Sequence, residues 1–375
     1  MDFTYSDEQQ QLAQSIERFF EREYDFAARR AIVASDEGWS RAIWARLAEL
    51  GVFALPLPEE CGGFGGRAID LVPFMQSAGR ALLVEPYLGT IGLCARLLAR
   101  SGSAQRSELL PAVAEGKLVL ALAHGERAAR YDLAHVETRA LQVANGYEID
   151  GEKHVVLGAP GADRLVVSAR LDDESRELGL FVVDPRLPGV SVRAYRTIDE
   201  QRAADVRFER VRVAGSARID AEGNALALIE DAVDYATALI CAEAVGALRD
   251  ANDATLEYVK TRKQFGVAIG SFQALQHRLV DMHIAAEQAL SVSLLACTAV
   301  DEEADAARRK HSVSAAKIRI AEACRHVSQE AIQLHGGMGM SDEVKVSHTF
   351  RRLTVIGQQF GDVDHHLARF AACAE

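Results

Sequence analysis

The sequence predicts a mixed α+β protein in which a β-rich middle part separates two helical parts. Apolar residues recur at helical spacing near the start, short β-branched runs alternate with turn residues in the middle, and long Ala- and Leu-rich segments fill the last third. The chain has 375 residues, which is too long for one ordinary core of about 100 to 200 residues. We therefore predict packed domains at residues 1–116, 117–218 and 219–375.

The first part is predicted to be helical. Residues 6–9 have the pattern of a capping box, and apolar side chains then follow at helical spacing. A second helical stretch covers residues 70–115, where Pro86 and Pro111 are predicted joints. Between the two, residues 56–66 are rich in proline and glycine, which interrupt helices, so this segment is predicted to be a loop.

The middle part has the signals of many short strands. Residues 118–123 form an apolar run of strand length. Turn dipeptides follow at Asn145-Gly146 and Asp150-Gly151, and further β-branched or aromatic runs lie between glycines and prolines. Short strands without helices between them predict an antiparallel barrel or sandwich.

The last part predicts a helical bundle. Ala- and Leu-rich segments run over residues 225–260, 272–301 and 304–335, and glycine-containing or acidic breaks separate them. Helices of this length bury their apolar faces by packing side by side.

Composition and charge exclude several classes of protein. Hydrophobic residues make up 49% and charged residues 26%, which is typical of a globular chain and not of a disordered one. The 42 Lys and Arg against 54 Asp and Glu give a net charge of -12, which repels phosphate backbones and anionic lipid heads. Nucleic acid and membrane surfaces are therefore not expected partners. The start lacks a signal-peptide pattern and no apolar run approaches the roughly 18 residues of a membrane span, so the predicted location is the cytoplasm.

No structural metal site is expected. The six cysteines are scattered without paired spacing, as in a reducing compartment. Metal ligands are conceivable at the helix start that carries Asp362, Asp364, His365 and His366, but no Glu-x-x-His repeat accompanies them, and a solvated helix start explains them. Residues 62–66 resemble a phosphate loop only in composition, and a plain turn is the better interpretation.

Two segments at helix ends suit a ligand. Arg262-Lys263-Gln264-Phe265-Gly266, followed by Phe272-Gln273, offers a guanidinium fork, aromatic rings and amides, which suit a diphosphate and a flat ring. Gln333-Leu334-His335-Gly336-Gly337 ends another helix with glycines that let a ligand approach the backbone. On chemistry alone, a helix end and a turn explain each segment equally well.

Taken together, these segments resemble the acyl-CoA dehydrogenase family over essentially the whole chain. Four motifs occur in the family's order: the opening helix at 5–9, the proline- and glycine-rich segment 58–65, R-x-x-F-G at Arg262 and Q-x-x-G-G at Gln333. The resemblance implies an N-terminal helical domain, a middle β-barrel and a C-terminal four-helix bundle. It also implies FAD as cofactor, oxidation of an acyl-CoA thioester to a trans-2-enoyl-CoA, and an electron-transferring flavoprotein as acceptor.

The sequence departs from the family where the catalytic base is expected. In that chemistry a carboxylate removes the α-proton while the β-hydrogen leaves as hydride to the flavin. The family's common glutamate falls on Phe360, and the alternative glutamate of some members falls on Ala236. Neither side chain can take a proton.

A second departure lies in the β-rich part. The family loop that wraps the flavin corresponds to residues 125–132, which keep Glu126 and Asp132 but carry Arg130 and Tyr131 in place of small residues. The segment 153–158 lacks the usual Trp and Thr. The chain's own ring pocket is therefore predicted to be lost.

These departures have a common direction. In the family, the arginine and Gln-Gly-Gly segments reach across a subunit interface to the adenosine diphosphate part of a neighbour's FAD. The chain resembles the base-lacking small subunits of two-subunit dehydrogenases of the pimeloyl-CoA and steroid side-chain types, with a second dehydrogenase subunit, or itself in a dimer or tetramer, as partner. By this resemblance Arg262 pairs with the diphosphate and Phe265 packs near the adenine. The implied cofactor-binding residues are Arg262, Gln264, Phe265, Phe272, Gln273, Gln333, Gly336 and Gly337.

Two other hypotheses stay open. The chain is a self-sufficient homomeric dehydrogenase if Asp234, Glu343 or Asp364 is an unusual base. Each of these acids also has a structural explanation: a helix-surface charge for Asp234, a structural acid common in the family for Glu343, and a charge in the first turn of a helix for Asp364. The third hypothesis is a scaffold subunit that stabilises a partner and touches no cofactor.

Overall fold

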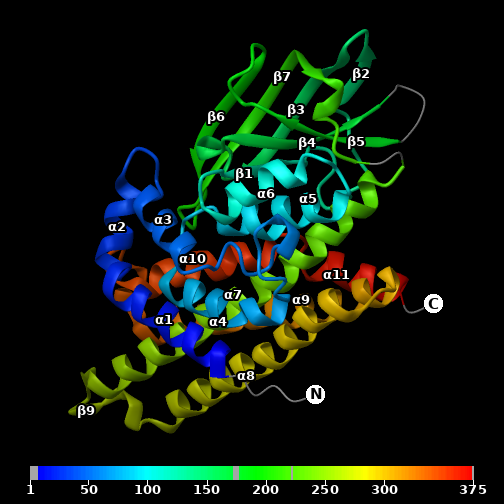
Figure 1. Cartoon of the computed structure of the whole chain (residues 1–375). Helices are drawn as coiled ribbons and strands as arrows, with labels where there is room; N and C mark the ends of the chain where they lie inside the picture. The colour runs from blue at the N-terminus through cyan, green and yellow to red at the C-terminus, as the bar shows by residue number, and fades with distance from the viewer. Residues whose placement is uncertain (1–6, 172–176, 221–222, 374–375) are drawn as a thin grey trace. The chain divides into compact units, whose positions relative to one another are not determined.

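The computed structural model describes residues 7–171, 177–220 and 223–373 (Figure 1). The chain divides into two compact units, each made of several segments. The bundle unit comprises Met1–Arg30, Ala68–Leu83 and Thr237–Glu375, and the sheet unit comprises Ala31–Arg67 and Val84–Ala236. The division into three domains at residues 116 and 218 stays a sequence prediction.

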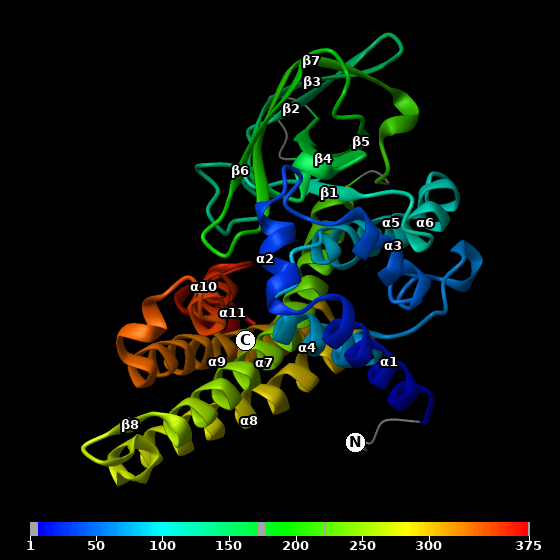
Figure 2. The same ribbon diagram turned by 90° about the vertical axis from the view of Figure 1, so that its left-hand side faces the viewer.

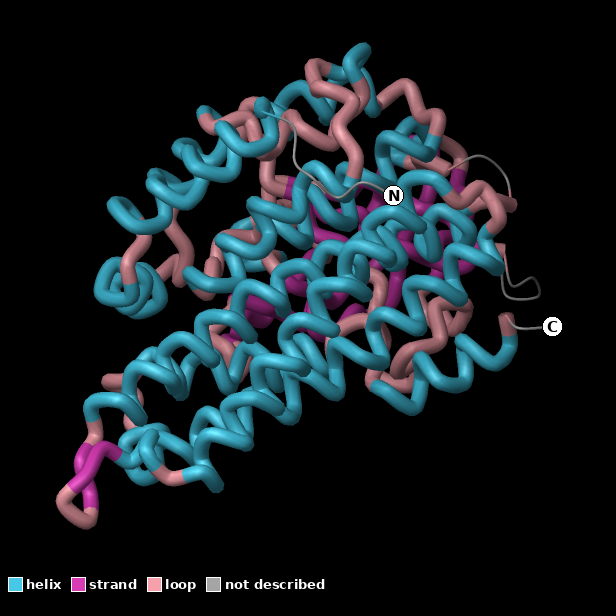
Figure 3. The backbone as a smooth tube through the Cα atoms, turned by 90° about the horizontal axis from the view of Figure 1, so that it is seen from below, coloured by secondary structure: helices cyan, strands magenta, loops and turns pink. Residues whose placement is uncertain are grey.

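Long helices build the bundle unit, as the sequence predicts, and Figure 3 shows them side by side. Helix α9 packs against α8, α10 and α11, and α4 packs against α1 and α8. The predicted capping box begins outside the described residues, but Ile16, Phe19 and Phe20 of α1 are buried, as their spacing predicts. The helices are α1 (Asp7–Glu23), α4 (Ala68–Ala81), α7 (Ala225–Thr261, in this unit from Thr237), α8 (Gln273–Glu302), α9 (Ala306–His335), α10 (Lys345–Gln358) and α11 (Val363–Ala372).

Helix α8 is more apolar than the sequence predicts, since no run of the length of a membrane span is expected. It is the one helix in the described part of the chain that is long and apolar enough to cross a membrane, judged by length and composition alone. Only 33% of its most apolar window is buried. Met282, Ala286 and Ala289 are buried at helical spacing, whereas Val280 and Ile284 are 54% and 48% exposed. One face of α8 therefore packs in the bundle, and another face is apolar and uncovered within this chain.

Helices α4 and α7 cross at glycines within the bundle unit. A Cβ atom on Gly79 would lie 1.9 Å from the carbonyl oxygen of Glu243, and one on Gly246 would lie 1.8 Å from the carbonyl oxygen of Gln76. Two backbones approach this closely only where neither residue has a side chain. The crossing thus depends on both glycines.

The sheet unit contains one curled seven-stranded sheet (Figure 1). Its order is β1-β4-β2-β3-β7-β6, and β5 pairs with β4. The sheet is mixed, not purely antiparallel, because β1 and β4 are parallel. Strands so far apart in sequence are not restricted to the antiparallel pairing that short hairpins impose. The strands are β1 (Leu120–Ala123), β2 (Arg139–Val143), β3 (Gly146–Leu157), β4 (Arg164–Arg170), β5 (Leu178–Val183), β6 (Val190–Arg196) and β7 (Arg202–Ala214).

Two local predictions need correction. The Asp150-Gly151 pair is not a turn, because it lies inside β3 at a break in the register with β7. Gly151 has a φ of +148°, and a Cβ atom there would lie 2.6 Å from the Thr138 hydroxyl, so a close approach and not a turn requires this glycine. Pro111 is not a joint, because it lies inside α6. Proline keeps a helical φ and costs the helix one donor.

Short helices complete the sheet unit. The segment at residues 62–66 is a plain turn, as predicted: the five amide N–H groups donate to nearby carbonyl oxygens of residues 54–59, so none is left for a phosphate. The short helices are α2 (Phe26–Ala34, whose first residues belong to the bundle unit), α3 (Arg41–Glu49), η1 (Glu59–Cys61), η2 (Leu88–Ala95), α5 (Arg96–Ser101), α6 (Arg106–Ala114), η3 (Ala159–Gly161) and η4 (Gly215–Ala217).

Candidate functional site

Arg262 lies at the base of a small hairpin that joins α7 to α8. The hairpin pairs β8 (Lys263–Gln264) with β9 (Val267–Ala268) at one end of the long helices, and η5 (Ile269–Ser271) leads into α8 (Figures 2 and 3). The amide of Arg262 donates to the carbonyl of Tyr258 (2.8 Å), and its carbonyl accepts from the amide of Ile269 (2.9 Å). Its side chain is exposed and has no hydrogen bond or ion pair within the described chain. A fixed backbone thus presents an unpartnered guanidinium.

Phe265 forms the tip of this hairpin. It is 91% exposed, and its φ of +54° is followed by +80° at Gly266, the left-handed pair that a tight two-residue turn requires. The ring of Phe272 lies edge-on to it, with the centroids 6.2 Å apart. The tip is therefore an exposed aromatic ring held in a left-handed turn.

Gln333 and the glycines after it form the second predicted segment. Helix α9 ends at His335, and the amide of Gly336 donates to the carbonyl of Gln333. Cβ atoms added at Gly336 or Gly337 would meet nothing within 4 Å, so both backbones are open to an approaching group. The short helix η6 (Gly336–Met340) continues the turn. The turn therefore offers an exposed amide side chain and accessible backbone.

The structure brings these two segments together. The ring of Tyr258, one turn before Arg262, stacks on His335, with centroids 4.4 Å apart and an interplanar angle of 24°. The sequence does not predict Tyr258 or His335 as site residues. The signal was their spacing, four residues before Arg262 and directly before Gly336, but only the fold shows that the rings meet.

Neither expected base position holds an acid. Ala236 is buried on α7. Phe360 lies between α10 and α11 with a φ of +62°, and its carbonyl oxygen lies 3.2 Å from Nε2 of His366. The Nζ of the buried Lys317 donates to the carbonyl of Gly361 (2.8 Å), which holds this turn from inside the bundle.

The comparisons with known proteins cover nearly the whole chain. Models of the acyl-CoA dehydrogenase N-terminal, middle and C-terminal domains match residues 6–117, 121–211 and 225–371. Acyl-CoA dehydrogenase FadE12 of Mycobacterium tuberculosis is 31% identical over 81% of this chain and 80% of its own length. The chain belongs to the acyl-CoA dehydrogenase family. An L-prolyl-(peptidyl-carrier protein) dehydrogenase of Serratia sp. is 29% identical over 92% of this chain and 90% of its own length.

Solved structures extend the likeness to this family's complexes. The ChsE4-ChsE5 complex from Mycobacterium tuberculosis matches with a TM-score of 0.87 and 25% identity, covering 99% of this chain and 98% of that one. The Tcur3481-Tcur3483 steroid ACAD matches with a TM-score of 0.87 and 28% identity, covering 98% of each chain.

Acyl-CoA dehydrogenases are FAD-dependent oxidoreductases, and the hairpin and turn of this member carry groups whose chemistry suits a diphosphate and a flat ring. Arg262 offers an unpartnered guanidinium for a diphosphate, and Phe265 offers an exposed ring for a flat base. Open backbone at Gly336 and Gly337 lets a ligand come close. Of the other predicted cofactor residues, Gln264, Phe272 and Gln273 are exposed on the same hairpin or at the start of α8.

The three alternative bases of this dehydrogenase differ in burial. Glu343 and Asp364 are exposed. Asp234 is fully buried on α7, so its interpretation as a helix-surface charge is wrong. The local pattern of polar and apolar residues does not show that the face of α7 that carries Asp234 is buried.

The residues considered for a metal form a helix start, only part of which is solvated. The Asp362 carboxylate accepts the amide of His365 (2.9 Å) and caps α11. His366 is buried against the hydroxyl of Ser314 (3.2 Å). One group in the described residues, Glu152, His154 and Asp205, has the spacing of metal ligands. Asp205 there is already bound by Arg193 and by the Tyr195 hydroxyl (3.3 Å).

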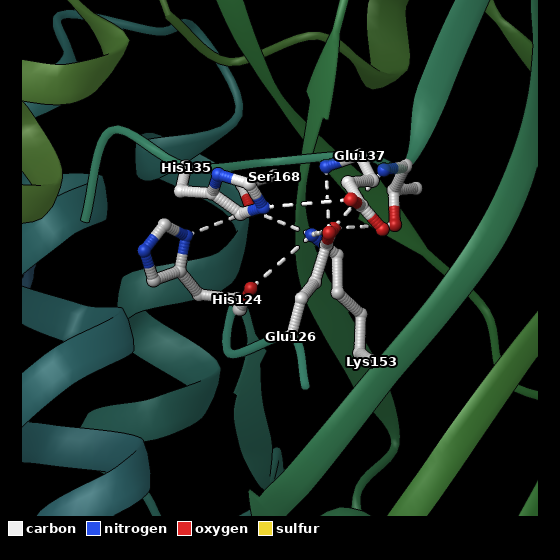
Figure 4. Close-up of polar contacts among 7 residues, drawn as sticks. His124, Glu126, His135, Glu137, Lys153 and Ser168 are labelled. Carbon is white, nitrogen blue, oxygen red and sulfur yellow. Dashed lines mark hydrogen bonds and ion pairs between the residues drawn. The ribbon is translucent and has the colours of Figure 1, made fainter. Parts of the chain in front are cut away.

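Glu126 belongs to a buried network in the sheet unit (Figure 4). Its carboxylate accepts from Lys153 Nζ (2.7 Å) and from the amide of Thr138 (3.0 Å). Lys153 also donates to the hydroxyl of Ser168 (3.1 Å), which lies 2.8 Å from Nδ1 of His124. Burial alone would raise the pKa of Glu126, but Lys153 and the amides lower it. Burial also lowers the pKa of Lys153 to about 8. This pair is engaged within the protein and anchors the 125–132 loop.

The segments 125–132 and 153–158 each contain a residue with left-handed backbone. Arg130 has a φ of +50°, and Val155, 58% exposed at a second break in the β3–β7 register, has a φ of +54°. Such values are costly for a β-branched residue. The β3–β7 register is thus broken at Val155, and the side chain there is a valine in a segment that lacks the Trp and Thr usual in the family.

Proposed function

We propose that this chain is the base-lacking subunit of a hetero-oligomeric, flavin-dependent acyl-CoA dehydrogenase and completes the FAD site of its partner. The observation that carries the proposal is that the chain has lost the catalytic acid but has kept the arginine of the cofactor segment. Ala236 and Phe360 stand where the family has its acid, while Arg262 is exposed and unpartnered in a fixed backbone. An arginine kept for a neighbour's cofactor, in a chain whose own base positions carry no acid, favours a subunit that serves a partner.

Each retained residue has a role in this proposal. Arg262 pairs with the diphosphate, and Phe265 packs near the adenine. Gln333, Gly336 and Gly337 bind through amide groups, and Gln264, Phe272 and Gln273 line the same surface. FAD, when bound, supplies the hydride acceptor for the β-hydrogen of an acyl-CoA. The partner supplies the base, an electron-transferring flavoprotein takes the electrons, and the complex is cytoplasmic.

The uncovered face of α8 supports assembly with a partner. Val280, Ile284 and Leu295 on this helix are each about half exposed, from 46% to 54%. Exposed apolar residues that share one face are typical of a surface that contacts another protein. Two of the similar solved structures carry paired names, ChsE4-ChsE5 and Tcur3481-Tcur3483, the first described as a complex.

A homomeric dehydrogenase with Asp234 as its base is the second candidate. The observation in its favour is the complete burial of this carboxylate two residues before Ala236 on α7.

The visible absorption spectrum separates the candidates. The chain is purified alone and together with the dehydrogenase subunit that co-purifies with it, and each sample is assayed for acyl-CoA oxidation. The proposal expects a colourless, inactive chain and a yellow, active complex. A yellow and active chain alone would overturn it, and loss of that activity in Asp234→Asn would establish the homomeric candidate.

Substitution of Arg262 tests its role directly. In the complex, Arg262→Ala is expected to weaken FAD binding about 10- to 100-fold, because a charge-assisted contact with the diphosphate is lost. Lys263→Ala is the matched control, since it removes one exposed charge from the same hairpin. Equal FAD dissociation constants for Arg262→Ala and the unaltered complex would favour a scaffold subunit that touches no cofactor.

A further inference from the structure

The stacked pair of Tyr258 and His335 connects the two segments of the proposed cofactor surface. Tyr258 lies on the last turn of α7 and His335 is the last residue of α9. Their near-parallel rings, 4.4 Å apart at 24°, form a direct side-chain contact between the end of α7 and the end of α9. Stacking of this geometry fixes two helix ends more closely than aliphatic packing does, because flat rings tolerate little tilt.

Backbone hydrogen bonds extend this contact to the residues that face a ligand. The carbonyl of Tyr258 accepts the amide of Arg262 (2.8 Å), so a shift of Tyr258 moves the start of the hairpin. His335 precedes Gly336 directly, and the amide of Gly336 is held by the carbonyl of Gln333. Any change in the distance between the two rings is therefore passed to Arg262 on one side and to the two glycines on the other.

His335 is itself held in one orientation. It is 6% exposed, and its Nδ1 lies 2.8 Å from the carbonyl oxygen of Ala331, which can only accept, so Nδ1 carries the proton. Burial lowers the pKa of His335, an effect that the hydrogen bond to Ala331 opposes in part. The His335 side chain is thus a neutral imidazole in a fixed orientation, which suits stacking.

We propose that Tyr258 and His335 are positioning residues that set the separation between the Arg262 guanidinium and the open amides of Gly336 and Gly337. The proposal rests on the function proposed above, in which these groups bind the diphosphate half of FAD. Neither ring is assigned a contact with the cofactor. The pair acts through Arg262, because a guanidinium that is displaced by about 1 Å from its bonding position loses its paired hydrogen bonds to a diphosphate.

The test compares FAD dissociation constants of the assembled complex, measured by flavin fluorescence on titration of the FAD-free complex. His335→Ala and Tyr258→Leu each remove the stack and are expected to weaken FAD binding about three- to tenfold. His335→Phe keeps a ring for the stack and is expected to bind FAD within about twofold of the unaltered complex. His326→Ala, an exposed histidine of the same helix, is the matched control and should change nothing.

Combination with Arg262→Ala distinguishes positioning from a general loss of structure. If the rings act through Arg262, His335→Ala adds little once the guanidinium is gone, whereas a loss of structure would add its full effect. Thermal melting of each complex identifies variants that do not fold. The inference is overturned if His335→Ala binds FAD as tightly as the unaltered complex, or if His335→Phe binds FAD as weakly as His335→Ala. In either case the proposed function still stands if Arg262→Ala weakens FAD binding. Unaltered affinity in Arg262→Ala overturns the proposed function itself.

Discussion

Buried histidines show, at the scale of single residues, how the fold changes ordinary side-chain chemistry. His124 in the sheet unit and His366 in the bundle unit are both buried. Burial is the largest cause that lowers the pKa of each from 6.5 to about 3, and a nearby lysine, Lys153 or Lys317, adds to it. For His124 the charge of Glu126 acts in the opposite direction. Both histidines therefore stay neutral where an unfolded chain would take up a proton.

We expect the free energy of unfolding to fall as the pH is lowered from 6.5 towards 3. In that window the unfolded chain binds a proton at His124 that the folded chain does not, since the folded pKa is about 3. The slope from one histidine is at most about 1.4 kcal/mol per pH unit. Urea unfolding between about pH 6.5 and 4.5 measures it, and His124→Gln should flatten the dependence. An unchanged slope in the variant would contradict the assignment.

At the scale of elements, the crossing of α4 and α7 depends on Gly79 and Gly246. Each glycine faces a backbone carbonyl of the other helix at less than 2 Å from where its Cβ would be. A methyl group on either residue has to push the helices apart, since neither carbonyl can rotate away without breaking its helix. The pair fixes how closely two bundle helices approach.

Gly246→Ala is expected to destabilise the chain by about 1–3 kcal/mol, even though alanine is the better helix former by about 1 kcal/mol. Gly357→Ala is the matched control, because Gly357 also lies in a helix and a Cβ atom there would meet nothing within 4 Å. That control should gain about 0.5–1 kcal/mol. Chemical denaturation measures both. Equal effects of the two substitutions would show that helix propensity and not the crossing decides.

Short-range patterns predict some of these elements well and others not at all. The helical periodicity of 225–335 predicts the three long helices because packing in a bundle repeats every few residues. Asp150-Gly151 has a turn signal, yet Thr138 on the other side of the β2–β3 hairpin requires the glycine there. The parallel pairing of β1 with β4 has no local signal either. Contacts between distant segments decide what local patterns leave open.

The same limit applies to the candidate site. Residue types predict Arg262 and the Gln333 turn as ligand-binding segments, and this assignment stays a prediction. Their proximity is seen in the contact between Tyr258 and His335, which joins residues far apart in sequence. The burial of Asp234 likewise depends on how its helix is covered and not on its immediate neighbours.

At the scale of the whole molecule, the uncovered face of α8 predicts how the protein assembles. Ile284→Glu is expected to weaken association with the partner subunit about 10- to 100-fold, because an apolar contact is lost and a charge is placed in the interface. Leu141→Glu is the matched control, since Leu141 is 45% exposed against 48% for Ile284 but lies on β2. Sizing with light scattering measures both complexes. Full assembly of Ile284→Glu would exclude this face as the interface.

The parallel pairing of β1 with β4 also has a consequence for synthesis of the chain. Leu120 pairs with Arg164, so β1 leaves the ribosome well before its partner exists. The β2–β3 and β4–β5 hairpins are local and close first, because short loops cost less entropy than long ones. Until β4 has been made, Leu120 to Ala123 is an apolar strand without its partner. In the folded protein three of its four side chains are fully buried. The nascent chain therefore exposes this apolar strand until β4 has been made.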